Sequence, residues 1–206
     1  MKKIKILIAD DHAVVRMGLA SLFSAKADFE VVGQAKNGEI AVREARRCAP
    51  DVVIMDLMMP GMDGAETTRA IRATVPNARI LVLTSCSASD TIASALDAGA
   101  HGAIMKSAEN TELIAAIRKI ASGDEYVSPE VRSLIDNDPP IVGLTGRQTE
   151  VLQSLSRGLT NKDIARQLGI SIRSVEDHVD RILERIGAAN RAEAVAIALR
   201  KHLLKI

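Results

Sequence analysis

Short apolar runs alternate with amphipathic stretches over residues 1–121. The runs are Ile4–Ala9, Glu30–Ala35, Val52–Met55, Ile80–Leu83 and Gly102–Met105. The stretches between and after them have apolar residues at helical spacing, as at Leu113, Ile114, Ile117 and Ile120. Strands that alternate with helix-length segments are typical of βαβ units, and largely uninterrupted apolar runs indicate burial on both faces. The pattern predicts an α/β domain in which a doubly wound, five-stranded parallel sheet has helices on both faces.

A break in this pattern follows Ala121. Turn and helix-breaking residues are concentrated at 122–125 and 136–140, with one short helical candidate, Glu130–Ile135, between them. We therefore expect a first domain at 1–122, a linker at 123–143 and a second, smaller domain at 144–206.

Residues 144–206 predict four short helices. Thr145 and Gln148 have the spacing of a capping box, in which each side chain satisfies a backbone N–H near the helix start. Further helix starts are expected at Thr160, Ser171 and Asn190, and helix ends near Gly158, Gly169 and Gly187. The second domain should be a compact all-α bundle.

Composition and charge narrow the classes of protein. No apolar run approaches the ~20 residues that span a membrane, and the first run stops at Asp10 and Asp11 without a signal-peptide cleavage site. Cys48 and Cys86 lack metal-ligand spacing and are expected to be reduced thiols. We expect a cytoplasmic protein without membrane contact.

The charge is distributed unevenly along the chain. Residues 144–206 carry 11 Lys and Arg against 7 Asp and Glu, whereas residues 1–143 carry 16 Lys and Arg against 19 Asp and Glu. The basic excess of the C-terminal part is compatible with nucleic-acid binding.

Polar residues of complementary chemistry follow the first, third, fourth and fifth predicted strands. Asp10 and Asp11 end the first strand, Asp56 the third, Thr84 the fourth and Lys106 the fifth. The carboxyl ends of parallel strands meet at one edge, where open α/β sheets bind their ligands. We therefore expect three carboxylates, a hydroxyl and an ammonium group to lie together.

This set of groups predicts phosphoryl chemistry. Neighbouring carboxylates repel one another, and Mg²⁺, which prefers hard oxygen ligands, would remove the conflict. Asp56 is the candidate phosphate acceptor, because a buried strand delivers it and Pro60 and Gly61 then turn the chain away. Thr84 and Lys106 would contact the phosphoryl oxygens.

Two further polar residues near this edge receive structural interpretations. Asp63 is assigned to the turn that follows Asp56, and His12 to a solvent-facing helix start. Neither is expected to bind metal or to take part in the chemistry.

Residues 1–121 resemble the receiver domains of two-component response regulators, which have a flavodoxin-like fold. The resemblance rests on the motifs Ile8–His12, Met55–Gly64, Leu83–Ser85 and Ala98–Lys106. It implies that Asp56 accepts phosphate from a sensor histidine kinase, with only self-directed phosphorylation chemistry and no separate substrate. It implies that Asp11, Asp56 and the Met58 backbone carbonyl hold Mg²⁺, with Asp10 assisting through water. Receivers usually have an aromatic residue three positions before the lysine, and Ala103 stands there, so the aromatic half of their switch is absent.

Residues 144–204 resemble the LuxR-type helix-turn-helix domain of the NarL/FixJ family. Asn161–Ile170 matches the bracing helix and its turn, Ser171–Ile186 the recognition helix, and Asn190–Ala194 the start of the last helix. The resemblance implies binding to promoter DNA, with a homodimer favoured by phosphorylation. The predicted DNA contacts are Lys162, Arg166, Arg173, Ser174, Glu176, Asp177, Asp180 and Arg181.

The recognition helix departs from the family in its charge. Its apolar stripe, expected to be core, is Val175, Val179, Ile182 and Ile186. Its other face has Glu176, Asp177 and Asp180 where family members commonly carry lysine or other non-acidic residues. Carboxylates accept hydrogen bonds from cytosine N4, but near phosphates they lower the affinity. A solvated face without DNA contact is the alternative, and His178 is expected to pack against the bundle.

Two hypotheses about function follow. In the first, phosphorylation of Asp56 controls a DNA-binding transcriptional regulator, with the last helix, Ala194–Leu199, as either dimer surface or core. In the second, the protein is a phosphorylation-controlled signalling adaptor whose acidic helix binds a protein and binds DNA poorly or not at all. A hydrolase is not expected, because the sequence has no Walker loop, zinc spacing or nucleophile elbow.

Overall fold

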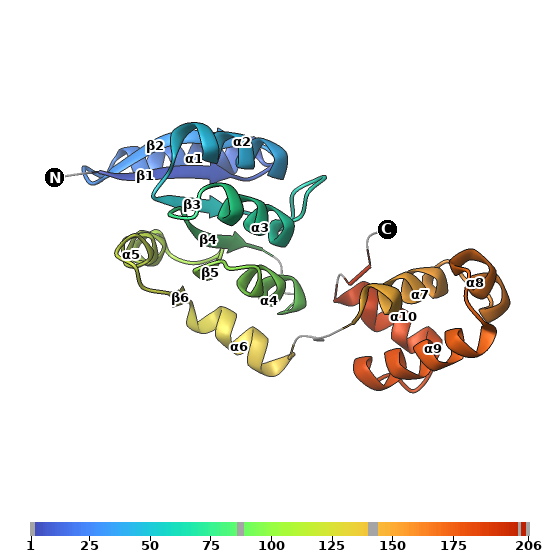
Figure 1. Cartoon of the computed structure of the whole chain (residues 1–206). Helices are drawn as coiled ribbons and strands as arrows, with labels where there is room; N and C mark the ends of the chain where they lie inside the picture. Colours follow the sequence, from blue (N-terminus) through green and yellow to red (C-terminus); the bar gives the residue numbers. More distant parts are fainter. Residues whose placement is uncertain (1–2, 86–88, 140–143, 202, 205–206) are drawn as a thin grey trace. The chain divides into compact units, whose positions relative to one another are not determined.

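The computed structural model describes residues 3–85, 89–139, 144–201 and 203–204 (Figure 1). The chain divides into two compact units, Met1–Ser87 with Thr91–Asn137 and Ala88–Asp90 with Asp138–Ile206. Among the described residues, no helix is both long enough and apolar enough to span a bilayer.

The first unit is built on a parallel sheet with the strand order β2-β1-β3-β4-β5-β6. The strands are β1 (Ile4–Ala9), β2 (Phe29–Ala35), β3 (Val52–Met55), β4 (Arg79–Thr84), β5 (Gly102–Met105) and β6 (Tyr126–Val127). Strand β1 pairs with both β2 and β3, so the strand order reverses at β1. Ligands of open α/β sheets bind beyond the carboxyl ends of the strands at such a reversal.

The sheet has six strands, one more than the five that the sequence predicted. The sixth, β6, comes from the segment predicted as a linker and pairs with β5, placing Tyr126 opposite Gly102. A Cβ at position 102 would collide with the Tyr126 carbonyl, so glycine permits this close approach. A strand of two residues has no periodicity to detect, which explains the missed strand. Helix α6 (Pro129–Asn137) follows it and buries Val131 against the same unit.

Helices cover both faces of the sheet (Figure 1). They are α1 (Ala13–Ser24), α2 (Gly38–Cys48), α3 (Gly64–Thr74), α4 (Ser89–Asp97) and α5 (Asn110–Ala121). Alternate residues of β1 divide between the two layers: Ile6 and Ile8 pack with α1 and α5, whereas Leu7 and Ala9 pack with α2 and α3. The central strands β3 and β5 are apolar and buried along their whole length because both of their faces are covered, as predicted, whereas the edge strand β2 exposes Glu30 and Gln34.

Over its described residues 144–201 and 203–204, the second unit consists of four helices. They are α7 (Gly146–Ser156), α8 (Asn161–Leu168), α9 (Ile172–Ile186) and α10 (Arg191–Arg200). All four predicted caps are confirmed, since Thr145, Thr160, Ser171 and Asn190 each accept a hydrogen bond from the backbone N–H three residues on. Gly169 and Gly187 end α8 and α9 in the left-handed conformation, which a glycine adopts without steric cost. The helices enclose one apolar core.

Candidate functional site

The polar residues at the ends of the strands meet at the carboxyl edge of the sheet. Asp10 follows β1, Asp56 follows β3, Thr84 is the last residue of β4, and Lys106 follows β5. Backbone hydrogen bonds align these ends: the Asp56 N–H donates to the Ala9 carbonyl at 2.8 Å, and the Lys106 N–H donates to the Thr84 carbonyl at 2.8 Å. The strand ends that carry the predicted residues therefore lie side by side at one edge.

Lys106 joins two of the acids. Its Nζ lies 2.7 Å from Asp10 Oδ2 and 2.8 Å from Asp56 Oδ2, and both carboxylates are nearly fully buried. Burial alone would lower the pKa of Lys106, but the hydrogen bonds and negative charges of Asp10 and Asp56 outweigh it and raise this pKa above its ordinary value. The pocket thus contains one fixed positive charge.

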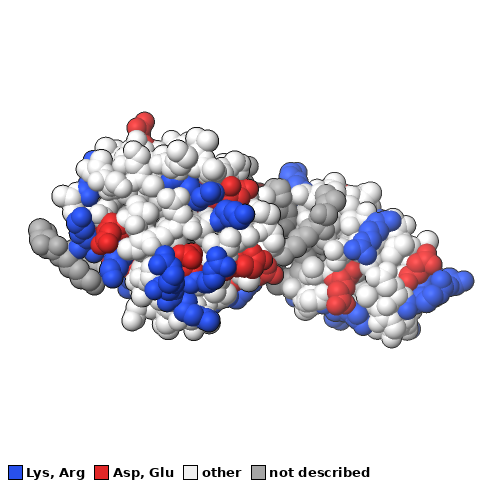
Figure 2. Space-filling view, turned by 90° about the horizontal axis from the view of Figure 1, so that it is seen from above, with Lys and Arg blue, Asp and Glu red and all other residues white. Residues whose placement is uncertain are grey.

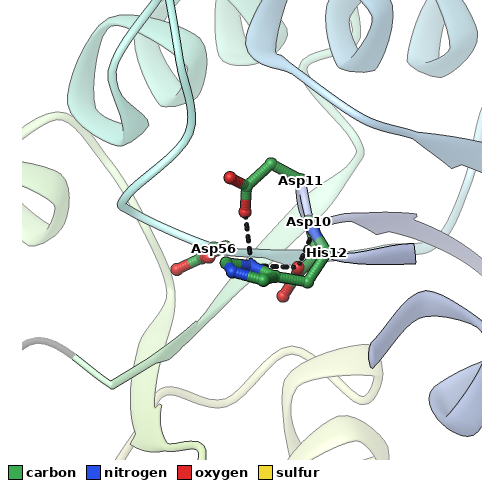
Figure 3. A group of neighbouring side chains, drawn as sticks. All are labelled: Asp10, Asp11, His12 and Asp56. Carbon is green, nitrogen blue, oxygen red and sulfur yellow. Dashed lines mark hydrogen bonds and ion pairs between the residues drawn. The ribbon is translucent and has the colours of Figure 1, made fainter. Parts of the chain in front are cut away.

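Asp11 brings a third carboxylate into the same pocket (Figure 3). Ligand atoms of Asp10, Asp11, His12 and Asp56 lie within 4.8 Å of one another. Asp11 Oδ1 is buried and makes no hydrogen bond, although His12 Nδ1 lies 2.7 Å away. A buried carboxylate oxygen is costly unless a donor or a cation compensates it, and His12 Nδ1 does so only when its ring is protonated at that nitrogen. The residues therefore fit a divalent cation with oxygen ligands.

Further contacts fix the two buried acids. Asp10 Oδ1 accepts a hydrogen bond from the His12 N–H at 2.7 Å, and the Asp10 carbonyl accepts one from Arg16 Nη1 at 2.7 Å. Asp56 Oδ1 accepts a weaker one from the Met58 N–H at 3.3 Å. The sequence interpretation missed Arg16, which lies on α1 and not at a strand end. The available signal was that Arg16 is the single charged residue in that helix.

Thr84, Asp63 and His12 lie near the acids, and the structure defines the surroundings of each. The Thr84 side chain is fully buried, and Thr84 lies opposite Met105 in the register of β4 and β5. Asp63 is the N-cap of α3 and forms a capping box with Glu66, which confirms its assignment to the turn. His12 occupies the N-cap position of α1 with its side chain 67% exposed, as expected of a solvent-facing helix start. The sequence interpretation placed His12 beside the acids without a role, and in the structure its Nδ1 lies 2.7 Å from Asp11 Oδ1.

Ala103 occupies the position where receivers usually have an aromatic residue. It is fully buried and packs with Leu57, Val82 and Ile92 in the layer between the sheet and α4. A methyl group fixed in a core has no alternative rotamer, so this position holds no side chain that could change orientation with the site.

The second unit presents the predicted contact residues on α8 and α9. All of them are exposed except Ser174, which is half-buried and whose N–H donates to the Ser171 cap. The stripe of Val175, Val179, Ile182 and Ile186 is buried, as predicted. On the face shown in Figure 2, both positive and negative side chains are present on each unit.

Two known families match the chain, one for each unit. Residues 6–118 match the response regulator receiver domain, and residues 142–198 match the luxR family of bacterial regulatory proteins. Curated proteins match along the whole length. The transcriptional regulatory protein LiaR of Bacillus subtilis (strain 168) is 36% identical over 209 residues, which cover 98% of this chain and 99% of LiaR. The chain belongs to the response regulators.

Other matches agree with this assignment. The response regulator protein VraR of Staphylococcus aureus (strain NCTC 8325 / PS 47) is 35% identical over 207 residues, 98% of this chain and 99% of VraR. The crystal structure of the response regulator ChrA of a heme-sensing two-component system is 34% identical, with a TM-score of 0.57 over 99% of this response regulator and 100% of ChrA. RcsB from Salmonella enterica serovar Typhimurium, solved bound to a promoter with the phosphomimetic BeF3−, shares the fold, with a TM-score of 0.71 at 23% identity over 97% and 99% of the two chains.

The last helix of this response regulator contributes mainly to the core of its unit. Ala194 and Ala198 are fully buried, whereas Leu199 is 36% exposed. His178 on α9 is half-buried, as expected from packing, and its Nδ1 is buried without a hydrogen-bond partner.

Proposed function

We propose that Asp56 of this response regulator accepts phosphate from a sensor histidine kinase and that the phosphate controls binding of the luxR-family domain to promoter DNA. The observation that supports the proposal is the bridge from Lys106 Nζ to Asp10 and Asp56, beside the Asp11 oxygen that lacks a hydrogen bond. Such a pocket combines a nucleophile, a fixed cation and clustered carboxylate oxygens that could ligate a second cation.

Asp56 acts as the nucleophile in this proposal. One of its carboxylate oxygens attacks the phosphorus of a phosphohistidine, a P–O bond forms while the P–N bond breaks, and the released imidazole takes a proton from solvent. Lys106 Nζ, 2.8 Å from Asp56 Oδ2, stays close to the transferred group and offsets its negative charge. Thr84, at the end of the neighbouring strand, donates its hydroxyl hydrogen to a phosphoryl oxygen.

The proposed ligands of Mg²⁺ are the Asp11 and Asp56 carboxylates and the Met58 backbone carbonyl, with Asp10 assisting through water. Bound there, Mg²⁺ would neutralise charge that develops on the phosphoryl oxygens. The donor set supports this assignment, because hard oxygen atoms predominate and one of them, Asp11 Oδ1, is buried without a hydrogen bond.

The luxR-family domain is proposed to bind DNA through the helix-turn-helix formed by α8 and α9. Helix α8 would brace the backbone, and α9 would enter the major groove. The proposed contacts to phosphates come from Lys162, Arg166, Arg173 and Arg181, and those near base edges from Ser174, Glu176, Asp177 and Asp180. Phosphorylation would favour a homodimer whose two α9 helices bind two half-sites.

A DNA-binding assay with and without phosphate tests switch and output together. The full chain would be titrated against a fluorescent pool of genomic promoter fragments from its own source, with and without a small phosphodonor plus Mg²⁺. We expect the phosphodonor to tighten binding about tenfold or more, which corresponds to roughly 1.4 kcal/mol of coupling. The Asp56→Asn variant should show no such change.

The alternative function, a signalling adaptor, is the other outcome of this assay. Its specific support is that the acids of α9 are exposed and carry no ion pair among the described residues. Absence of DNA binding in both phosphorylation states would overturn the DNA-binding output and leave the receiver proposal standing.

A further inference from the structure

Three acidic residues lie on the outward side of α9, and we call Glu176, Asp177 and Asp180 the acidic face. At about 100° per residue they span an arc of roughly 100° on the side away from the buried stripe. All three are exposed and fall in the first nine residues of the helix, counted from Ile172. In a helix-turn-helix, the N-terminal part of the second helix contacts the base edges.

The carboxylates of the acidic face are not used for contacts within the described part of the chain. None of the three makes an ion pair or a side-chain hydrogen bond with another residue of the described chain. Other acids of the same unit do: Glu150 pairs with Arg147 at 2.7 Å, and Asp163 lies 3.6 Å from Arg166. The oxygens of the acidic face therefore keep their full capacity to accept hydrogen bonds from a ligand.

A carboxylate in the major groove discriminates between bases because it only accepts hydrogen bonds. Cytosine presents its N4 amino group there, and adenine its N6 amino group beside an acceptor nitrogen. Guanine presents two acceptors, and thymine presents an acceptor and a methyl group, so both would leave a carboxylate desolvated and unpaired. Cytosine is the base that fits a lone carboxylate best.

The same charges oppose binding to DNA in general. Each carboxylate that approaches the duplex reduces the attraction between the unit and the phosphates, which supplies most non-specific affinity. The attraction would come from exposed cations around the acidic face, namely Lys162, Arg166, Arg173, Arg181, Arg185 and Arg191. Binding then depends on hydrogen bonds that compensate the desolvation of the acids, and only some sequences provide them.

We propose that the acidic face of α9 is a selectivity element, which accepts hydrogen bonds from cytosine amino groups in the major groove and weakens binding to DNA that lacks them. This inference rests on the proposed DNA-binding function. It predicts that this chain prefers cytosine at the contacted positions and has a low affinity for non-specific DNA. Both properties can be measured separately from the question of whether the chain binds DNA at all.

The test begins with selection of bound sequences from a pool of randomised duplexes by the full chain in the presence of phosphodonor and Mg²⁺. The sites bound by the wild type should be enriched in cytosine on one strand of each half-site. In the selected duplex, replacing one such C·G pair by T·A should weaken wild-type binding about tenfold. The corresponding alanine variant, Glu176→Ala, Asp177→Ala or Asp180→Ala, should lose less than about twofold from the same replacement.

Glu184→Ala is the matched control, because Glu184 is an exposed acid in the last turn of the same helix. It removes the same charge but should keep the wild-type base preference. Alanine favours helix at exposed positions, so the variants should fold, as circular dichroism would check. If all variants bind every duplex more tightly with an unchanged base preference, the acids only repel phosphates and the inference is wrong. If neither the wild type nor any variant binds DNA, the proposed function itself fails.

Discussion

The two acidic groups of this response regulator behave differently although they are built from the same kind of side chain. At the edge of the sheet, Asp10 and Asp56 are buried, and Lys106 bridges them at 2.7 and 2.8 Å. On α9, the acidic face is exposed and unpaired within the described chain. Buried charges must be compensated by neighbours, whereas exposed charges interact mainly with water.

The surroundings of the carboxylates restrict their chemical role far more in the receiver pocket than on α9. In the receiver pocket, the neighbours of each carboxylate restrict its role to a few chemical options, because geometry, burial and charge all act together. On α9, the structure leaves the oxygens open to solvent, and only the position of the helix in a helix-turn-helix points to a ligand. Variants that shift charge in each group should therefore have very different effects on stability.

The largest change in the free energy of unfolding is expected from Lys106→Met. It leaves two nearly buried carboxylates facing one another without their cation, and the free energy of unfolding should fall by about 3 kcal/mol, at the low end for such pairs because the lysine side chain is 18% exposed. The pKa of Lys106 is raised in the folded chain, so its stabilising charge is fully present below the ordinary value of 10.5 and is lost only above it. Urea unfolding at neutral pH therefore measures the whole contribution. A loss no larger than that of a surface substitution would contradict the comparison.

Asp11→Asn is expected to change the free energy of unfolding by a smaller amount and in the opposite direction, toward higher stability. Removing the carboxylate that Lys106 does not neutralise should relieve repulsion and raise the free energy of unfolding by about 1 kcal/mol without Mg²⁺. In the wild type, Mg²⁺ at ten times its dissociation constant should add about 1.4 kcal/mol, and this addition should be absent in the variant. Thermal unfolding across a Mg²⁺ titration measures both quantities. Equal Mg²⁺ stabilisation of the two proteins would remove Asp11 from the proposed metal site.

The smallest change in the free energy of unfolding is expected from substitutions in the acidic face. Asp180→Ala should change the free energy of unfolding by less than about 0.5 kcal/mol, because its side chain is exposed and unpaired within the described chain. Val179→Ala, one residue away on the buried stripe, is the matched control and should cost about 2 kcal/mol through lost burial and a cavity. Chemical unfolding of both variants checks the pair, and a cost above 1 kcal/mol for Asp180→Ala would mean that the acid has a structural partner.

Much of the fold could be predicted from the sequence because its signals are local. Apolar runs gave five strands, and side chains such as Thr145 and Asn190, whose capping hydrogen bonds span three residues, gave the helix starts. Strand β6 was not predicted because, besides being short, it depends on a residue distant in the sequence: Gly102 lets the Tyr126 carbonyl approach.

The candidate site divides in the same way. Asp10, Asp56 and Lys106 could be grouped from the sequence, because parallel strands bring their carboxyl ends to one edge whatever the details of packing. Arg16 and the position of the His12 ring could not, because they depend on how α1 leaves the end of β1.

The most direct test of the central claim is the attachment of phosphate to Asp56. The full chain would be incubated with a small phosphodonor and Mg²⁺, and the modified residue located by mass spectrometry after trapping of the acyl phosphate. Asp63→Asn is the matched control, because asparagine caps a helix as well as aspartate and Asp63 lies at the start of α3. The account predicts that the wild type and Asp63→Asn are modified and that Asp56→Asn is not; equal modification of Asp56→Asn would contradict it.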